Sequence, residues 1–269
     1  MMSTLTRKTL AAFIAQHMEM GDTEWFFKPD VSGVHSLRFP SVKPLPRPAV
    51  MTGSHAAVKD INRPEPSDTA CAPSAVSEEN IVSQNNLDAL YSAVCGCMRC
   101  PLGGQRTNFV FGQGNPEADL MFIGEAPGQE EDAQGLAFVG RAGQLLTKMI
   151  KAIKLTREEV FIGNILKCRP PGNRDPQPLE IEQCEPILLK QIEIIQPTII
   201  CALGRIAGQT LLRTKSSLGA LRGKVHDYHG VKLVVTYHPA ALLRNPNWKP
   251  MAWEDLKYLR REYDGMEIA

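Results

Sequence analysis

The chain has 269 residues, of which 43% are hydrophobic and 22% charged, and its formal net charge is +1. This composition is that of a globular protein with one large domain, or with one domain and a tail. No apolar stretch approaches the roughly 20 residues needed to cross a bilayer, which excludes a membrane-spanning protein.

The first third of the chain differs in character from the rest. Residues 1–27 have a basic start and a short apolar core, which predict an amphipathic helix; a signal peptide fits poorly, and an organellar transit peptide is the alternative. Seven prolines lie between Pro40 and Pro73, in a segment with too little apolar surface to offset the entropy of ordering. We therefore predict an N-terminal helical element at 1–27, a disordered linker at 28–85 and a main domain at 86–269.

Short β-rich runs alternate with helical patterns from Asp119 onward. This alternation predicts an α/β domain of three layers, with helices on both faces of a central, mainly parallel, four-stranded sheet. Ligands bind such sheets beyond the carboxyl ends of the strands. The expected strands are 119–124, 160–166, 198–203 and 231–237, and the expected helices are 141–153, 178–195, 205–213 and 251–262.

Each expected strand leads into a segment of unusual composition, and we expect the four segments to meet in one crevice. They read GEAPG at 124–128, NILKCRPPGNR at 164–174, LGRIAG at 203–208 and HPAALLRNP at 238–246. The stretch 205–249 carries eight bases against one acid, Asp227. It indicates an anion-binding face, for which a solvated basic surface is the alternative.

Four of the seven cysteines are candidate metal ligands, because disulfides are unlikely in a chain without a secretory signal. Cys97, Cys100, Cys168 and Cys184 are separated by 2, 67 and 15 residues. One tight pair with two distant partners suits an iron–sulfur cluster better than zinc, which usually takes two tight pairs; unrelated core cysteines are a third possibility. Cys201 lies in an apolar strand as a small hydrophobe, Cys95 is a spare beside Cys97, and Cys71 lies in the linker.

In combination, GEAPGQEED with FVGRAG, NILKCRPPGNRDP, HPAALLRNP and the cysteine spacing resemble the family 4 uracil-DNA glycosylases, the iron–sulfur branch of that superfamily. The resemblance covers about 88–262. It implies a monofunctional enzyme that flips deoxyuridine out of DNA and hydrolyses its N-glycosidic bond. It also implies a structural [4Fe-4S] cluster on the four cysteines, with zinc as the alternative, and a cytoplasmic, nucleoid-associated monomer whose partner is uracil-containing DNA.

The resemblance places three side chains around the flipped base. Phe138 would stack on the pyrimidine, Asn164 would distinguish uracil from cytosine by its O4 and N3–H edge, and His238 would donate to O2 as negative charge develops there. The alternatives are a core phenylalanine, a core asparagine bonded to backbone groups, and a structural histidine.

The loop after the first strand would form one wall of this pocket. Its glycines, Gly124 and Gly128, let the backbone approach the base and sugar. Glu125 would position water or backbone, although it does not correspond to the activating aspartate of better-known uracil-DNA glycosylases. Asn173 is expected to contact the substrate, although its position, like that of Glu131, has a less settled role in the family.

The remaining site residues are expected to contact DNA. Leu242 and Leu243 could fill the gap left by the flipped nucleotide while Arg244 grips its phosphates; alternatively the leucines cap the core. Lys167 and Arg169, with Arg174, flank Cys168 and point to a DNA-facing loop held by the cluster.

Other functions remain open from the sequence. A non-turnover iron–sulfur module that binds uracil-DNA or nucleic acid is the main alternative. A ferredoxin-like carrier is disfavoured because it would not need Asn164 or His238, and no dinucleotide-binding glycine motif follows a strand. The N-terminal element could recruit a repair or replication protein.

Overall fold

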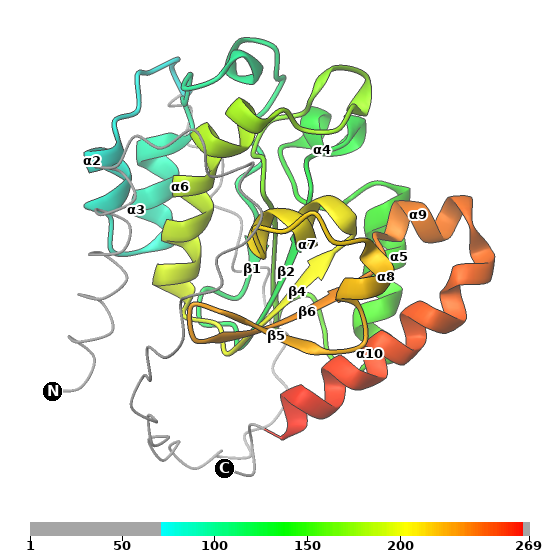
Figure 1. The fold of residues 1–269 in the computed structure, drawn as a ribbon. Helices are drawn as coiled ribbons and strands as arrows, with labels where there is room; N and C mark the ends of the chain where they lie inside the picture. The colour runs from blue at the N-terminus through cyan, green and yellow to red at the C-terminus, as the bar shows by residue number, and fades with distance from the viewer. Residues whose placement is uncertain (1–70, 266–269) are drawn as a thin grey trace, which may run out of the picture.

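The computed structural model describes residues 71–265, and its centre is a six-stranded sheet in the order β1-β3-β2-β4-β6-β5 (Figure 1). The α/β class is confirmed, and the four expected strands are the four that pair in parallel. The expected strand number is wrong, because a short antiparallel strand flanks each edge. The strands are β1 (Gln113–Gly114), β2 (Leu120–Gly124), β3 (Phe161–Asn164), β4 (Ile199–Leu203), β5 (Val225–Tyr228) and β6 (Val231–Thr236).

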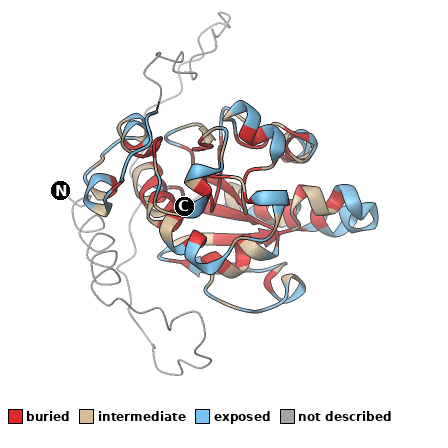
Figure 2. Cartoon of the chain, turned by 90° about the horizontal axis from the view of Figure 1, so that it is seen from above, coloured by how far each residue is buried: buried red, intermediate tan, exposed pale blue. Residues whose placement is uncertain are grey.

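The central strands are buried on both faces, as their continuous apolar sequences require (Figure 2). Alternate residues of β2 face opposite ways: Met121 and Ile123 belong to one hydrophobic core, and Leu120 and Phe122 to the other. All four side chains are at most 1% exposed. The sheet is therefore the middle of three layers.

Each core is closed by its own set of helices, and in Figure 1 the helices α2, α3 and α6 of the first set lie to the left of the strands while α5, α9 and α10 of the second lie to the right. The first set is α2 (Glu78–Val82), α3 (Leu87–Val94), α6 (Pro178–Ile195), α7 (Arg205–Leu211) and α8 (Leu218–Leu221); the second is α5 (Arg141–Ala152), α9 (Pro239–Arg244) and α10 (Lys249–Asp264). The remaining short helices lie in connections: α4 (Gln129–Gln134), η2 (Pro101–Gly104), η3 (Pro171–Asn173) and η4 (Pro246–Trp248).

Residues 71–85, which we predicted from the sequence to be part of the disordered linker, are ordered and pack against the domain. Val76 and Ile81 are 7% and 0% exposed within the first core. Cys71 forms a disulfide with Cys95, so the expectation that disulfides are absent is wrong for this pair. Residues 71–85 therefore belong to the domain, while the predicted helix at 1–27 and the rest of the predicted linker at 28–70 lie outside the described residues.

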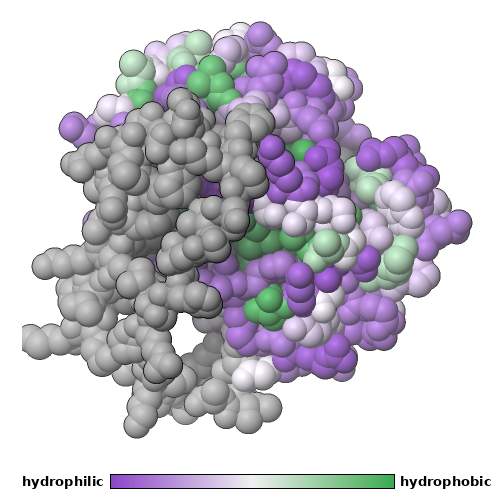
Figure 3. Space-filling view, viewed as in Figure 1, coloured by the Kyte–Doolittle hydropathy of each residue, from purple (hydrophilic) through white to green (hydrophobic). Residues whose placement is uncertain are grey.

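The surface shown in Figure 3 is mainly hydrophilic where the chain is described, with small hydrophobic patches. Large exposed hydrophobic side chains near the C-terminal end include Leu243, Trp248, Met251 and Trp253. Between residues 71 and 265, no helix combines the length and apolarity that a bilayer span demands.

Candidate active site

The segments that follow the four parallel strands converge at one edge of the sheet. Glu125, directly after β2, lies in the electrostatic field of Asp175, Arg205 and Arg244, which belong to the segments after the other three strands. Arg205 and Asp175 also form an ion pair of 2.9 Å. This convergence is the expected result of a parallel sheet, whose carboxyl ends all face the same way.

Gly124, the last residue of β2, forms the floor between two candidate pocket side chains. A Cβ at this position would lie against Asn164 Oδ1 and 2.5 Å from Phe138 Cζ, so no side chain fits there. Gly204, directly after β4, likewise leaves room for a neighbouring side chain, because a Cβ there would lie 2.9 Å from His238 Cβ. The two glycines therefore let Phe138, Asn164 and His238 crowd together.

Phe138 is held in the left-handed region of the backbone, with φ of 52°, and its ring centroid lies 5.7 Å from that of His238. Glu131 fixes this loop, since its Oε1 accepts hydrogen bonds of 2.9 Å from the N–H groups of Val139 and Gly140. Arg157 donates to the Phe138 carbonyl at 3.1 Å. Glu131, whose role the sequence left open, thus holds the backbone that directly follows Phe138.

Asn164 ends β3 with its side chain turned into this crowded space. The residue is 2% exposed, and its Oδ1 has no hydrogen-bond partner in the structure. An unsatisfied buried acceptor costs about 1–3 kcal/mol, so a native protein that keeps one has a reason outside its own fold. A bound ligand with an N–H group would supply the partner.

His238 caps the N-terminus of α9 and is neutral at physiological pH. Its Nδ1 accepts a hydrogen bond of 3.2 Å from the Ala240 N–H. Although part of its surface is accessible, protein atoms surround the ring, and this desolvation, reinforced by Arg244, lowers its pKa to about 4. The neutral ring therefore carries its proton on Nε2, which can donate to a ligand.

Glu125 is half-buried and has the opposite perturbation. Burial, followed by the nearby Asp175 carboxylate, raises its pKa to about 7, against the opposing effect of Arg205 and Arg244. A carboxyl group poised near neutrality is typical of a site where protons or water are handled.

The four candidate ligand cysteines are all free thiols and lie near one another. The pKa values of Cys100, Cys168 and Cys184 each respond to the charge of other members of the set, and Cys97 acts on two of them. Burial raises the pKa of Cys168 to about 11 and of Cys184 to about 12. Arg106 donates to Cys168 Sγ at 3.4 Å, a contact that no sequence pattern had indicated.

The cysteine spacing leaves both kinds of centre, zinc and an iron–sulfur cluster, as predictions. Among residues 71–265, no group of three or more Cys, His, Asp or Glu side chains is arranged to hold a metal ion. A tetrahedral zinc site needs four ligands within about 2.3 Å of its centre, whereas an iron–sulfur cube spans a wider gap. Cys201 lies in β4 at 0% exposure, as its sequence position predicted.

Two of the expected DNA contacts are wrong. Lys167 is 0% exposed and Leu242 is 2% exposed in the second core. Leu243 and Arg244, next in the chain, are exposed and can meet a ligand from solvent. Residue type alone could not separate Leu242 from Leu243, because the orientation of α9 decides which side chain is buried.

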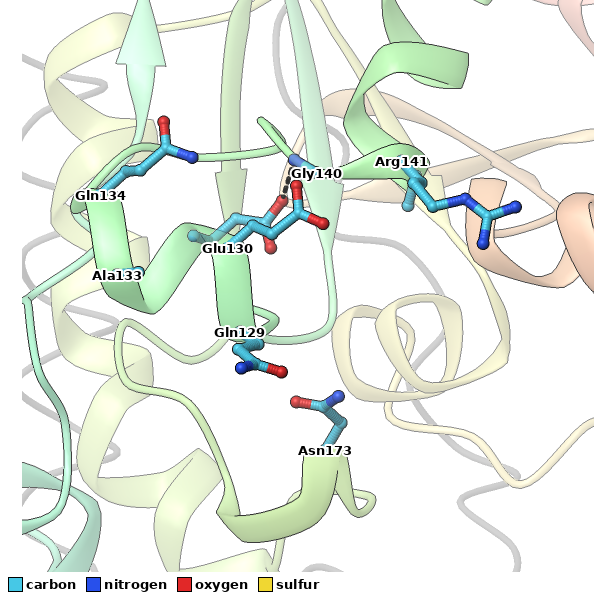
Figure 4. A pocket seen from close by; sticks show the side chains of 9 residues that line it. Gln129, Glu130, Ala133, Gln134, Gly140, Arg141 and Asn173 are labelled. Atoms are coloured by element: carbon cyan, nitrogen blue, oxygen red, sulfur yellow. Dashed lines mark hydrogen bonds between the residues drawn. The ribbon is translucent and has the colours of Figure 1, made fainter.

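The other expected contacts lie beside the pocket loop. Asn173 is exposed, and its Oδ1 accepts a hydrogen bond of 2.8 Å from Arg169 Nε. It lines a hollow of about 540 Å³ with Gln129 and Arg141, and Figure 4 shows its amide facing that of Gln129. Gly128 caps the N-terminus of α4, and its N–H donates to Glu131 Oε2 at 3.1 Å. Asn173, Arg169 and Gly128 thus stand at the rim, and their roles stay predictions.

A family model described as "Uracil DNA glycosylase superfamily" matches residues 111–257, which hold the whole candidate pocket. The chain belongs to the uracil DNA glycosylase superfamily. Three relatives are each named "Type-4 uracil-DNA glycosylase". That of Archaeoglobus fulgidus is 42% identical over 180 residues, 64% of this chain and 90% of the relative. That of Sulfurisphaera tokodaii is 47% identical over 185 residues, 65% and 84% of the two chains. That of Saccharolobus solfataricus is 46% identical over 193 residues, 68% and 89%. The resemblance inferred from the motifs of this superfamily is confirmed.

Proposed function

We propose that the protein is a DNA-repair enzyme that flips deoxyuridine out of DNA and hydrolyses its N-glycosidic bond, leaving an abasic site. The observation that carries this proposal is the buried, unpartnered Asn164 Oδ1 beside the rings of Phe138 and His238. The relatives named type-4 uracil-DNA glycosylases support it.

Base recognition follows from the donors and acceptors of Asn164. Its Oδ1 would accept from uracil N3–H, and its Nδ2 would donate to uracil O4. Cytosine presents an acceptor at N3 and a donor at its amino group, so the same amide orientation opposes it at both points. Phe138 would stack on the flipped ring.

Bond cleavage places negative charge on uracil O2, and His238 is arranged to meet it. Because Ala240 N–H occupies Nδ1, the Nε2–H group is the one left to donate. A neutral donor in a desolvated pocket stabilises the departing anion, and removing one such donor usually costs about 10²–10³ in rate.

A water molecule then adds to the sugar, which makes the enzyme a monofunctional hydrolase. Glu125, ionised above its pKa of about 7, would position that water or the backbone around it. Lys167 is unsuited to act as an amine nucleophile, because its buried Nζ is hydrogen-bonded to Asn164 O and Gln191 Oε1.

We propose that the protein binds a [4Fe-4S] cluster, with Cys97, Cys100, Cys168 and Cys184 as its ligands. Buried thiols with raised pKa values need a positively charged occupant to ionise, and iron supplies it. The cluster would act as a structural centre that fixes the segment after β3. Brown protein with equal iron and sulfide would support it, whereas stoichiometric zinc would support the alternative.

DNA would approach across the exposed Leu243 and Arg244 and the basic stretch 205–249. Phosphate contacts of this kind lose affinity steeply as salt rises. We further propose that the enzyme acts as a nucleoid-associated monomer, and that residues 1–27 recruit a repair or replication protein.

The test is incubation with a uracil-containing oligonucleotide, followed by alkaline cleavage at abasic sites. Wild type and an Asn85→Ala control, altered at an exposed asparagine in the turn before α3, should cleave equally. Asn164→Ala and His238→Ala should be slower by about 10²–10³. Tight binding of uracil-DNA without any abasic product would instead support a non-turnover binding module, and wild-type rates in both variants would show that the pocket is misplaced.

A further inference from the structure

Lys167 is a lysine with no exposed surface, which needs an explanation because lysine is almost never fully buried without partners. Its Nζ donates to the Asn164 carbonyl at 2.8 Å and to Gln191 Oε1 at 2.6 Å. Gln191, also 0% exposed, passes the chain on by donating from Nε2 to the Phe111 carbonyl at 2.9 Å. The charge is therefore committed to an internal network.

This network lies where β1 and β3 stop pairing. β1 pairs with β3 only as far as Ile162, two positions before Asn164. The Asn164 carbonyl therefore has no partner on β1. The Phe111 carbonyl, which lies before β1 in the chain, likewise has no partner on β3. Lys167 and Gln191 bridge these two carbonyls and so replace the missing rung of the ladder.

The same lysine also touches the cysteine site. Its backbone N–H donates to Cys184 Sγ at 3.3 Å, and Cys168 is the next residue. The Lys167 carbonyl in turn accepts a hydrogen bond of 2.9 Å from the N–H of Val110, in the segment before β1. Lys167 thus contacts both the strand end that carries Asn164 and Cys184, which lies 17 positions further along the chain.

We propose that Lys167 is a positioning residue for uracil recognition: it fixes the end of β3 so that the Asn164 amide is held in the base pocket, in register with the cysteine site. The inference rests on the proposed glycosylase function and adds a residue that does not touch the substrate. Its effect passes through the Asn164 backbone, since Oδ1 itself has no protein partner to hold it.

Lys167→Met tests this, because methionine keeps the length of the side chain and removes the donor. Loss of a supporting hydrogen bond behind a functional side chain commonly costs 10–100-fold, so we expect single-turnover uracil excision to fall by about 10–100-fold. Affinity for DNA carrying an uncleavable fluorinated deoxyuridine should fall as well, while affinity for the same DNA with thymidine should not change.

The decisive comparison is a double-mutant cycle with Asn164→Ala. If Lys167 acts through Asn164, adding Lys167→Met to Asn164→Ala should change the rate by less than about twofold. Gln191→Leu, which removes the second half of the bridge, should behave in the same way. Lys190→Met is the matched control, since Lys190 is also buried but pairs with Glu193, and it should remain near wild type.

Iron and sulfide content and visible absorbance are measured on every variant. Full additivity in the cycle would overturn the proposal, and so would loss of iron in step with activity in both Lys167→Met and Gln191→Leu, because the bridge would then support the cysteines instead of Asn164. Failure of the proposed function would look different: wild type itself would release no uracil.

Discussion

The end of β3 and the segment after it give one residue to each site, Asn164 to the base pocket and Cys168 to the cysteine site, and the two residues differ in how fully the protein satisfies their hydrogen bonds. Asn164 holds a buried oxygen without a protein partner. Four residues later, Cys168 accepts a hydrogen bond from Arg106, which also donates to the carbonyls of Cys95 and Cys97. The base pocket thus keeps a polar atom free for a ligand that binds transiently, whereas the cysteine site has protein hydrogen bonds around it, as suits a ligand that stays bound.

The pocket carries several local costs that the fold tolerates. Phe138 has a positive φ, His238 has a pKa lowered to about 4, and Glu125 has a pKa raised to about 7. Strain and perturbed protonation of this kind gather at functional sites because they prepare a group for its ligand. Substitutions in the pocket should therefore reduce activity more than stability, and substitutions around the cysteines the reverse.

The largest effect should come from Cys184→Ser. Losing a ligand of the proposed structural cluster would remove the occupant that the buried thiols require, so the free energy of unfolding should fall by more than about 4 kcal/mol. Visible absorbance and iron content report the loss directly. Cys201→Ala, at a buried cysteine in β4, should keep its iron. Full iron in Cys184→Ser would remove this residue from the ligand set.

The next effect should separate two neighbouring leucines. Leu242→Ala, in the second core, should lower the free energy of unfolding by about 2–5 kcal/mol in a denaturant titration. Leu243→Ala, on the surface, should change it by no more than about 0.5 kcal/mol but weaken binding to uracil-DNA. Equal losses of stability would mean that Leu243 is not available to DNA.

The smallest effect concerns Glu125 and pH. Its folded-state pKa of about 7 exceeds the usual 4.5, so folding favours the protonated form, and that stabilisation is lost as pH rises through about 7. Glu125→Gln should therefore melt higher than wild type near pH 8, by about 2–4 °C once solvent screening is considered, and equally only below the unfolded-state pKa of 4.5. Its excision rate should be low and without the rise near pH 7 that wild type shows. A wild-type profile flat across that range would contradict the role of Glu125.

Much of this contrast was accessible from sequence. The central strands were predictable because their apolar runs are continuous, and the segments after them were predictable as neighbours because the carboxyl ends of parallel strands meet at one edge of the sheet. Asn164 and His238 were named within those segments by the resemblance to the family 4 enzymes. The edge strands were not predictable: β1 has two residues, and β5 reads VHDY with most of its side chains partly exposed. Neither gives a periodic pattern.

Lys167 and Leu242 were misassigned for a related reason. Whether a lysine next to other bases is buried depends on its partner, and Gln191 lies 24 positions away on α6. Arg106 was missed because a single arginine in an irregular segment carries no signal until the fold brings Cys168 beside it. Tertiary contacts at long range, absent from local patterns, decided all three.

Crystals of the protein soaked with free uracil would test the central claim most directly. We predict uracil stacked on Phe138, with N3 within about 3.2 Å of Asn164 Oδ1 and O2 within the same reach of His238 Nε2. Uracil bound elsewhere, or an Asn164 Oδ1 still without a partner at a uracil concentration that inhibits excision, would contradict it.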